Sequence, residues 1–405
     1  MSQQETGSGG PLRGLKVVEV ASFVAVPAAG AMLADLGADV VKVEVPNGEI
    51  YRKGRPAFQG FDSDFPESPG FQMDNRGKRS MALDLTRPEA RAALLRVIDG
   101  ADVVLTNLLP ERRKKYGLDH ASLRARKPSL VVGAISGYGI DGPREDEPAF
   151  DYTAYWARGG LMDLMRDAGV PPSMQRPGIG DHAAASNLVC GLLAGLRERD
   201  RSGEGCYVDV SLRNTALHIM GTDAATTLVT GVAPGRHDRK APLNALWNTY
   251  PVAGDDRWLM LCMIEPDRYW DVFCRAIGRQ DLLEDERFAD GWARTSNAAA
   301  LVAELEETFA GKTLPEWEKV LNESRLIWAP VKRIDEVVEE PSARAHRYFH
   351  TLEHAEAGEF ETVSLPIQME GHDLTPRRAA APLGADTRAV LAEAGLSERE
   401  IDEAV

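Results

Sequence analysis

Short β-branched runs alternate with helical segments along the first half of the chain, and this alternation restricts the fold more than any other feature. A strand is predicted at 15–20, an Ala-rich helix with a proline in its first turn at 27–36, and a second strand at 38–45. Further elements are predicted at 87–99 (helix), 102–106 (strand), 130–136 (strand), 181–199 (helix) and 206–210 (strand). Such alternation is typical of an α/β fold, in which helices cover a mostly parallel sheet.

The character of the chain changes near residue 230. The stretch 230–242 is loop-like, and the density of tryptophan and tyrosine rises after it. We therefore predict a second, smaller domain at 226–335. The N-terminal part of a large domain is predicted at 1–225, and a linker with a C-terminal part at 336–405.

Composition and charge narrow the class of protein. The 405 residues include 62 Asp and Glu against 47 Lys and Arg, which gives a net charge of -15. An acidic chain repels the phosphates of nucleic acid, so no nucleic-acid partner is expected. The polar start of the chain does not resemble a signal peptide, and no apolar run reaches the roughly 18 residues of a membrane span. We expect a cytoplasmic protein with no membrane partner.

Two glycine-containing stretches resemble nucleotide sites only in part. The G-x-G-x-x-G string at 137–142 follows a predicted strand, but prolines and charges follow it instead of a helix. The stretch 75–80 resembles the end of a phosphate loop but lacks the required glycine at position 72. Its cations Lys78 and Arg79 either pair with phosphates of another ligand or belong to a solvated face. No dinucleotide cofactor is expected.

Signals for metal, serine and cysteine chemistry are weak. His346, His350 and His354 recur every four residues, but the residues between them break up a ligand cage, so no metal is expected. The chain has no G-x-S-x-G elbow, and its four cysteines lack any C-x-x-C pair. Any nucleophile in this protein is therefore of another type.

Asp181 is the main candidate nucleophile. It follows Gly180 and precedes three alanines at the predicted start of a helix. One interpretation is a helix N-cap. The other is a nucleophilic carboxylate near backbone N–H groups that stabilise a developing oxyanion. An unperturbed aspartate has a pKa of about 3.9 and is ionised at neutral pH, so it needs no partner base. Spacing alone does not choose between the two.

A set of motifs in fixed order resembles the family III CoA transferases, from about residue 12 to about residue 387. The opening segments are Leu12–Val20 and Leu33–Glu44. The later motifs are Asn75–Ser80, Leu83–Leu85, Asn107, Tyr116–Leu118, Ser136–Gly139, Asp141–Pro143, Gly180–Asp181 and Ala381–Gly384. Each piece is short, but the ordered set is specific, and the chain is identified as a member of this family.

The resemblance implies an architecture and a reaction. The expected fold has a large Rossmann-like parallel-sheet domain made from both chain ends, a smaller inserted α+β domain, and two interlocked subunits in a homodimer. The expected reaction transfers CoA from an acyl-CoA donor to a carboxylic acid acceptor through an aspartyl-CoA thioester on Asp181. The coenzyme A thioester is then a substrate, and no permanently bound cofactor is expected.

The resemblance also assigns residues. The expected CoA-binding residues are Val24, Lys78, Arg79, Asn107, Lys115 and Tyr116. The expected substrate pocket consists of Tyr138, Phe150 and Asp151. Val24 stands where a formyl-CoA transferase has glutamine, so oxalate–formate exchange is not favoured.

Two alternative activities within the family remain open. A third hypothesis is a protein that has the same fold but no catalytic activity. The 2-methylacyl-CoA racemases, which the chain also resembles, need a histidine directly before the aspartate that matches Asp151. Phe150 stands there and cannot move a proton, so acyl transfer is favoured over racemisation, with His182 as an untested substitute base. An intramolecular CoA transferase would use the same Asp181. A noncatalytic CoA-binding protein is disfavoured because Asp181 is retained.

Overall fold

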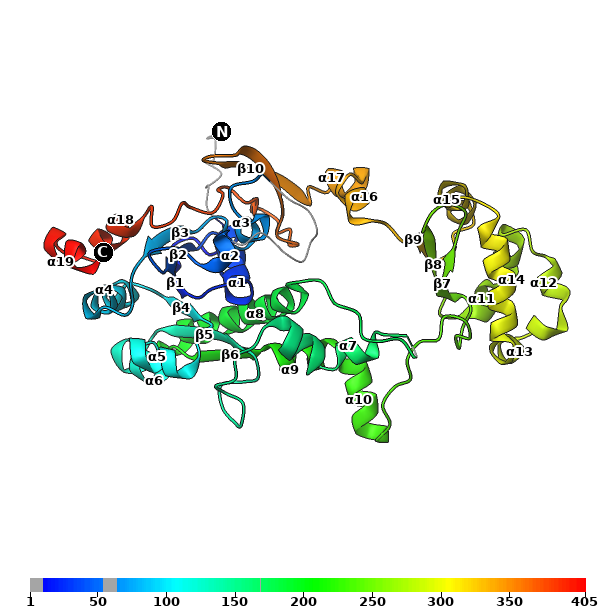
Figure 1. Ribbon diagram of the computed structural model, residues 1–405, viewed down its shortest axis with the longest axis horizontal. Helices are drawn as coiled ribbons and strands as arrows, with labels where there is room; N and C mark the ends of the chain where they lie inside the picture. The colour runs from blue at the N-terminus through cyan, green and yellow to red at the C-terminus, as the bar shows by residue number, and fades with distance from the viewer. Residues whose placement is uncertain (1–9, 54–63, 168) are drawn as a thin grey trace. The chain divides into compact units, whose positions relative to one another are not determined.

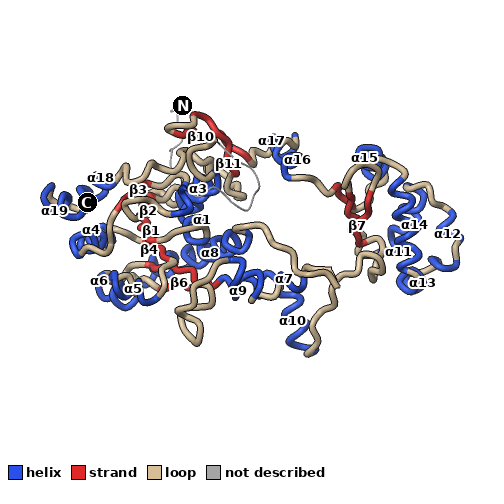
Figure 2. Tube along the Cα trace, in the orientation of Figure 1, coloured by secondary structure: helices blue, strands red, loops and turns tan. Residues whose placement is uncertain are grey.

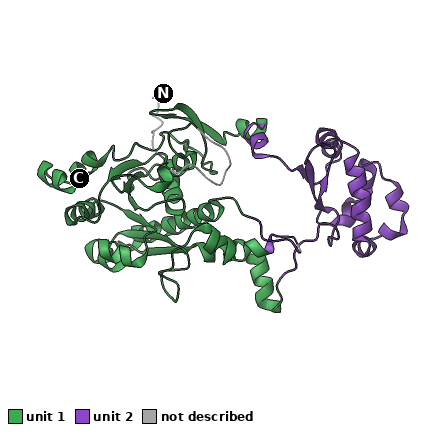
Figure 3. Ribbon diagram, in the orientation of Figure 1, with its two compact units in different colours: residues 1–163, 174–233, 341–405 green, residues 164–173, 234–340 purple. Residues whose placement is uncertain are grey.

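The computed structural model describes residues 10–53, 64–167 and 169–405, and it divides into two compact units (Figures 1 and 3). The large unit comprises 1–163, 174–233 and 341–405, and the small unit comprises 164–173 and 234–340. The predicted boundaries of the folding domains stay predictions. The expected cytoplasmic location rests partly on the polar residues 1–9, and these lie outside the described residues.

A six-stranded parallel sheet forms the centre of the large unit (Figure 1). Its strand order is β3-β2-β1-β4-β5-β6, the order of a Rossmann-type doubly wound sheet. The strands are β1 (Lys16–Val20), β2 (Asp39–Glu44), β3 (Arg79–Ala82), β4 (Val103–Thr106), β5 (Val131–Ser136) and β6 (Tyr207–Ser211). The predicted α/β fold with a parallel sheet is confirmed.

Helices cover both faces of this sheet, because successive strand residues point to opposite sides. Val17 packs into a core with α1 (Ala25–Asp35) and α8 (Ile179–Ser202). Val18 packs into a second core with residues of several other helices. These helices are α4 (Pro88–Asp99), α6 (His120–Arg126), α18 (Thr387–Glu393) and α19 (Glu398–Ala404). The sheet is thus buried on both faces, as its nearly continuous apolar strands require.

The remaining elements of the large unit are mostly short (Figure 2). They are α2 (Ile50–Lys53), α3 (Pro69–Asn75), α5 (Pro110–Tyr116), a π-helix η1 (Tyr152–Ala157), α7 (Leu161–Leu164, whose last residue belongs to the small unit), α9 (Leu212–Ile219), α10 (Gly221–Thr230), α17 (Pro341–Ala345), and the hairpin β10 (Phe349–His354) with β11 (Gly358–Val363). Within the described ranges, no helix combines the length and the apolar character needed to cross a bilayer.

The C-terminal segment returns to the edge of the parallel sheet. The Ser80 N–H donates to Asp386 at 2.9 Å, and the Ala82 N–H donates to the Thr387 hydroxyl at 3.0 Å. These side chains satisfy backbone donors of the edge strand β3, which would otherwise be open to pairing with another chain. The C-terminal segment therefore belongs to the same compact unit as the parallel sheet.

The small unit is a helical domain around a three-stranded antiparallel sheet. Its strands are β7 (Trp247–Pro251), β8 (Trp258–Cys262) and β9 (Trp328–Pro330), in the order β7-β8-β9. Its helices are α11 (Pro266–Ala276), α12 (Asp281–Glu284), η2 (Glu286–Phe288), α13 (Gly291–Ser296), α14 (Ala298–Ala310), α15 (Leu314–Glu323) and α16 (Ile334–Val338). Its core combines aliphatic side chains with aromatic ones, and Phe309 contacts the rings of Tyr250, Phe273 and Trp317.

Candidate active site

A pocket lies at the carboxyl ends of three neighbouring strands. Its walls come from residues 23–25 after β1, residues 107–110 after β4, and residues 135–137 at the end of β5. The strand order reverses between β1 and β4, and ligands of open α/β sheets bind in the crevice at such a switch point. Asp181, from the first turn of α8, completes this part of the lining.

Two glycines shape the turn that presents Asp181. Gly178 caps α8 with φ +80°, a left-handed conformation that favours glycine. At Gly180, a Cβ atom would lie 2.4 Å from the Tyr155 ring, so only glycine lets the π-helix η1 pack this closely. The sequence around Asp181 is therefore explained by packing against η1, and the helix N-terminus favours negative charge there.

A second carboxylate lies near Asp181 and changes its acidity. Asp151 is buried, and its Oδ2 accepts the Gly178 N–H at 3.0 Å. Burial, followed by the negative charge of Asp151, raises the pKa of Asp181 to about 7. The expectation of an ordinary, fully ionised aspartate at neutral pH is therefore wrong. Asp181 titrates close to neutral pH, the range in which a catalytic group is most useful.

His182 follows Asp181 and is held at both ring nitrogens. Its Nδ1 lies 2.8 Å from the Gly178 carbonyl oxygen, and its Nε2 lies 2.9 Å from Oδ1 of Asp74. Tyr51 donates its hydroxyl to the other oxygen of Asp74 at 3.2 Å. Burial alone would lower the pKa of His182, but the hydrogen bond and charge of Asp74 outweigh it, so the pKa is raised. The segment that carries Asp181 is thereby tied to α3.

The loop after β1 forms the opposite wall of the pocket. Phe23 adopts φ +64°, which is strained for a large side chain. Its N–H donates to Glu49 at 2.6 Å, and its ring meets the Phe150 ring edge-on at 5.2 Å between centroids. The Asn107 side chain donates to the Ser22 carbonyl at 2.7 Å and accepts the Ser22 N–H at 3.2 Å. This loop is therefore fixed from both sides.

Buried charges lie beneath this loop. Lys42 donates to Glu19 at 3.1 Å and to the Ala21 carbonyl at 3.2 Å, and its Nζ pairs with Glu49 Oε1 at 2.8 Å. Since Glu49 also accepts the Phe23 N–H, the network connects Lys42 to the strained residue of the loop. Burial on its own lowers the pKa of Lys42, but the surrounding carboxylates outweigh it and raise the value.

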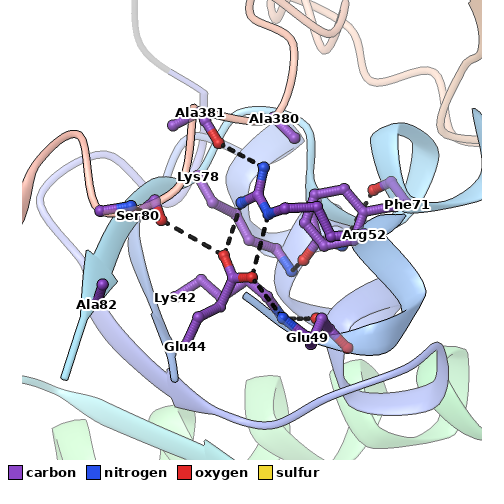
Figure 4. A network of polar contacts seen from close by, with 12 residues as sticks. Lys42, Glu44, Glu49, Arg52, Phe71, Lys78, Ser80, Ala82, Ala380 and Ala381 are labelled. Atoms are coloured by element: carbon purple, nitrogen blue, oxygen red, sulfur yellow. Dashed lines mark hydrogen bonds and ion pairs between the residues drawn. The ribbon is translucent and has the colours of Figure 1, made fainter. Parts of the chain in front are cut away.

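The same network extends to the C-terminal segment (Figure 4). Arg52 donates to both oxygens of Glu44, at 3.2 and 2.6 Å, and to the Ala381 carbonyl at 3.1 Å. Its guanidinium lies 4.3 Å from the centroid of the Phe71 ring. The C-terminal segment is thus fastened to the elements that support the pocket.

Lys78, a predicted CoA-binding residue, is buried in this network. Its ammonium donates to Glu19 at 2.8 Å, to the Pro27 carbonyl at 2.8 Å and to Asn75 at 2.9 Å. An ammonium has three N–H donors, and these contacts use all of them. Burial, opposed by Glu19 and assisted by Lys42, lowers the pKa of Lys78 to about 8. Its contacts give Lys78 a structural role beneath the loop.

Arg79, its neighbour in the sequence, is also paired within the chain. It donates to both oxygens of Asp39, at 3.0 and 2.7 Å, and to both oxygens of Glu393, at 2.9 Å each. These contacts tie β3 to β2 and to α18. As CoA ligands, Lys78 and Arg79 stay predictions.

The other predicted site residues are divided between the pocket and its surroundings. Val24, Asn107 and Phe150 line the pocket beside Asp181. The remaining four lie around it. Lys115 is exposed on α5, and its ammonium lies 6.0 Å from the centroid of the Tyr116 ring. The Arg158 guanidinium lies 5.4 Å from the centroid of the Tyr138 ring. Asp151 is buried and accepts the Gly178 N–H.

Sequence reasoning missed three residues of this region: Asp74, Glu49 and Phe23. Asp74 and Glu49 stand in segments with no chemical motif, and their partners are distant along the chain, 108 residues away for Asp74 and His182. For Phe23, the pattern gives no sign of a left-handed backbone. The position of the loop at the end of a predicted strand was the only available signal.

The three histidines predicted not to form a metal site lie near or on the β10 hairpin. His350 contacts the Ser364 hydroxyl, and His354 accepts the N–H groups of Glu356 and Ala357 at 3.2 and 3.1 Å. Over the part of the chain that the structure describes, no group of three or more His, Cys, Asp or Glu side chains is arranged to hold a metal ion.

Comparisons with known proteins agree with this fold. The model of CoA-transferase family III matches residues 12–387. The chain is 31% identical over 391 residues to an (R)-2-hydroxy-4-methylpentanoate CoA-transferase of Clostridioides difficile, covering 96% of this chain and 97% of that one. It is also 31% identical over 396 residues to a cinnamoyl-CoA:phenyllactate CoA-transferase of Clostridium sporogenes, covering 96% and 95%.

A solved structure is similar over nearly the whole length. The crystal structure of a CaiB/BaiF family protein from Brucella suis has a TM-score of 0.85 and 30% identity, covering 95% of this chain and 100% of that one. The fold is a Rossmann-type doubly wound sheet with a pocket at its switch point, the place where open α/β sheets generally bind ligands. The chain belongs to CoA-transferase family III, and it is a CoA transferase.

Proposed function

We propose that this enzyme transfers CoA from an acyl-CoA to a carboxylic acid through an aspartyl-CoA thioester on Asp181. The observation that carries the proposal is the position of Asp181, whose carboxylate lines the pocket at the switch point of the sheet. Family membership supports CoA thioesters as substrates. No permanently bound cofactor is invoked.

The first half of the reaction needs no proton transfer. A carboxylate oxygen of Asp181 attacks the thioester carbonyl, the C–S bond breaks, and CoA leaves as a thiolate. The product is a mixed anhydride between Asp181 and the acyl group. The thiolate then attacks the Asp181 carbonyl carbon, which releases the donor acid as a carboxylate and leaves CoA on Asp181.

The second half repeats these steps in reverse order. The acceptor carboxylate attacks the aspartyl-CoA thioester and displaces the thiolate, which forms a new anhydride. The thiolate attacks the acceptor carbonyl and restores the Asp181 carboxylate. One oxygen of the acceptor therefore enters Asp181 in each turnover, and one oxygen of Asp181 leaves with the donor acid of the next.

The geometry of His182 disfavours racemisation. A base must offer a free lone pair, but both ring nitrogens of His182 face acceptors, the Gly178 carbonyl and the Asp74 carboxylate. Phe150, at the position of the racemase histidine, offers no base either. Intramolecular transfer within one dicarboxylic acid would use the same Asp181, and it differs only in where the acceptor carboxylate is attached.

We propose that the thioester end of CoA lies along the loops of Val24 and Asn107, with the acyl group beside Phe150. The exposed Lys115 and the partly buried Tyr116, both on α5, are proposed to contact CoA further out. Tyr138 and Asp151 are proposed to shape the pocket from behind. The relatives are named for different acids.

We also propose that the active form is a homodimer, with the interlocked arrangement as its expected form. Helix α10, all of whose residues are described, buries none of them within the chain. Its residues Leu228 and Val229 are 86% and 87% exposed, which is unusual for neighbouring apolar side chains. Light scattering on the purified protein tests this directly, and a mass near 44.2 kDa would reject it. A cytoplasmic location stays a prediction.

Two isotope experiments test the proposed reaction. Incubation with an acyl-CoA and an acceptor acid labelled with ¹⁸O should move label into the released donor acid by way of Asp181, over successive turnovers. Transfer without such label movement would reject the aspartyl intermediate. A parallel incubation in deuterated water measures exchange of the α-proton, and rapid exchange without transfer would make the enzyme a racemase.

A further inference from the structure

His182 lies between two groups that can only accept hydrogen bonds. The Gly178 carbonyl oxygen is 2.8 Å from Nδ1, and a carboxylate oxygen of Asp74 is 2.9 Å from Nε2. Neither the carbonyl nor an ionised carboxylate has a proton to give, so each ring nitrogen must carry its own. Rotation of the ring by 180° would bring carbon atoms to both acceptors and lose both bonds. Both ring nitrogens therefore face hydrogen-bond acceptors, an arrangement that favours the imidazolium form.

We infer that His182 is a positioning residue, kept as an imidazolium by Asp74 and Gly178, whose positive charge favours the attacking carboxylate form of the neighbouring Asp181. This inference rests on the proposed function of Asp181. His182 itself gives no proton to the substrate, because both of its N–H groups are already engaged. It acts through its charge and through the hydrogen bonds that fix the first turn of α8.

The partners of His182 fix this charge in place. Asp74 is buried, and an isolated buried carboxylate is unfavourable unless it is paired and hydrogen-bonded. Its two oxygens are taken by the His182 ring and the Tyr51 hydroxyl, at 2.9 and 3.2 Å. The ammonium of Lys78 adds a further attractive charge, since each acts on the other. The hydrogen bond and the charge of Asp74 raise the pKa of His182, which favours the protonated ring.

The charges around Asp181 give the imidazolium its function. Asp151, from the start of η1, and Asp74, from α3, both raise the pKa of Asp181, and His182 lowers it. Tyr51 and Tyr152 also sense the Asp181 charge but are neutral near pH 7. Removing the His182 charge would leave three carboxylates close together and shift Asp181 toward its protonated form, which cannot attack a thioester.

Three substitutions separate charge from hydrogen bonding. His182→Asn retains a donor near the Gly178 carbonyl, and His182→Gln retains a donor near Asp74, but both are neutral. His182→Lys retains a positive charge that can reach Asp74. The rate of covalent adduct formation at Asp181 is measured against pH for each variant in a single turnover, with thermal unfolding as the test of folding.

The expected result is a shift in pH dependence. In both neutral variants, the midpoint of the acidic limb should move up by about one pH unit, with rates near the wild-type value well above that midpoint. His182→Lys should move the midpoint back toward the wild-type position. A folded Asn or Gln variant that is slower by the same factor at every pH would show a merely structural role and overturn the inference. An unchanged profile would also overturn it.

A second readout does not depend on transfer. In protein labelled with ¹⁵N-histidine, the His182 signals are identified by their loss in His182→Asn. Both ring nitrogens should be protonated at pH 7, and Asp74→Asn should lower the pH at which His182 loses its proton. A neutral His182 at pH 7 would overturn the inference. If the wild-type enzyme forms no adduct with any donor, the proposed function fails, and this spectrum still decides the state of His182.

Discussion

The large unit buries charged side chains beneath its pocket, whereas the small unit packs apolar side chains in its core. Beneath the pocket, the large unit buries Glu19, Lys42 and Lys78, each at most 3% exposed. The core of the small unit is instead apolar, with aliphatic side chains packed around Phe309 and its aromatic neighbours. Buried ion pairs seldom stabilise a fold more than apolar side chains would, because desolvation offsets their attraction. The charges of the large unit are therefore better explained by what they hold, which is the loop around Phe23.

Replacing Asp181 with alanine should have the largest effect on activity. The variant lacks the nucleophile, so CoA transfer should fall by at least about a thousandfold, while the free energy of unfolding changes little. Transfer is measured by mass spectrometry of the acyl-CoA products. The matched control is Asp271→Ala in the small unit, whose exposed pair with Arg275 lies on the surface of α11. That control should retain transfer, and a similar loss in both variants would contradict the assignment.

Replacing Glu19 with glutamine should break the charge network of the large unit. Lys42 and Lys78 would lose a shared carboxylate partner, and breaking a buried pair costs about 3–5 kcal/mol in the free energy of unfolding. Urea unfolding provides the measurement.

The same substitution at Glu306 of the small unit is the control for Glu19→Gln. Glu306 pairs with Arg239 and Lys240 but is partly solvated, so Glu306→Gln should cost about 1 kcal/mol or less. Equal losses in the free energy of unfolding at Glu19 and Glu306 would mean that the two units do not differ in how strongly they depend on charge pairs.

The core of the small unit should respond to shape rather than to charge. Phe309→Leu removes ring contacts with Tyr250 and Trp317 and should cost about 1–2 kcal/mol. Below its unfolding transition, this variant should form the Asp181 adduct with the wild-type pH dependence. A displaced pH profile would mean that the small-unit core influences the pKa of Asp181. It would contradict the claim that only the large unit sets this pKa.

Asp181 should destabilise the folded protein when it is ionised. Its pKa is about 7 in the folded state and about 3.9 in an unfolded chain. Between these pH values the folded state binds more protons than the unfolded chain does. The contribution of Asp181 to the free energy of unfolding is therefore fully present below about pH 4, and it is lost as pH rises through about 7.

Asp181→Asn tests this linkage. Because Asp181 is half-buried and solvent screens its charge, the variant should be more stable than wild type by about 1 kcal/mol at pH 8. The gain should vanish at pH 4, where the wild-type group is protonated as well. Urea unfolding at both pH values measures it, and a gain of the same size at both would mean that ionisation is not the cause.

Much of the fold could be predicted because its signals are local. The β-branched runs of β1, β2 and β5 are strong strand patterns, and the alternation with helices predicts a parallel sheet. The edge strand β3 escaped prediction since its four residues, Arg-Ser-Met-Ala, are stabilised by the distant C-terminal segment. Helix α19 was not predicted either, although Ser397 and Glu400 form the capping box that marks its start.

The site could be predicted only where a motif or the topology carried it. Asp181 stands in a family motif, and Val24 and Asn107 follow strands whose carboxyl ends meet. The pairing of Asp74 with His182 depends on chain segments brought together by the whole fold. The pKa of Asp181 likewise depends on burial and on Asp151, so neither the charge state nor the network could be derived from spacing.

The most direct test of the central claim is mass spectrometry of the peptide that carries Asp181 after incubation with a panel of acyl-CoAs. The account predicts a covalent adduct of CoA on Asp181 for at least one donor, loss of the adduct on addition of an acceptor acid, and no adduct in Asp181→Asn. Efficient CoA transfer with an unmodified Asp181 peptide under single-turnover conditions, or an adduct that persists in Asp181→Asn, would contradict it.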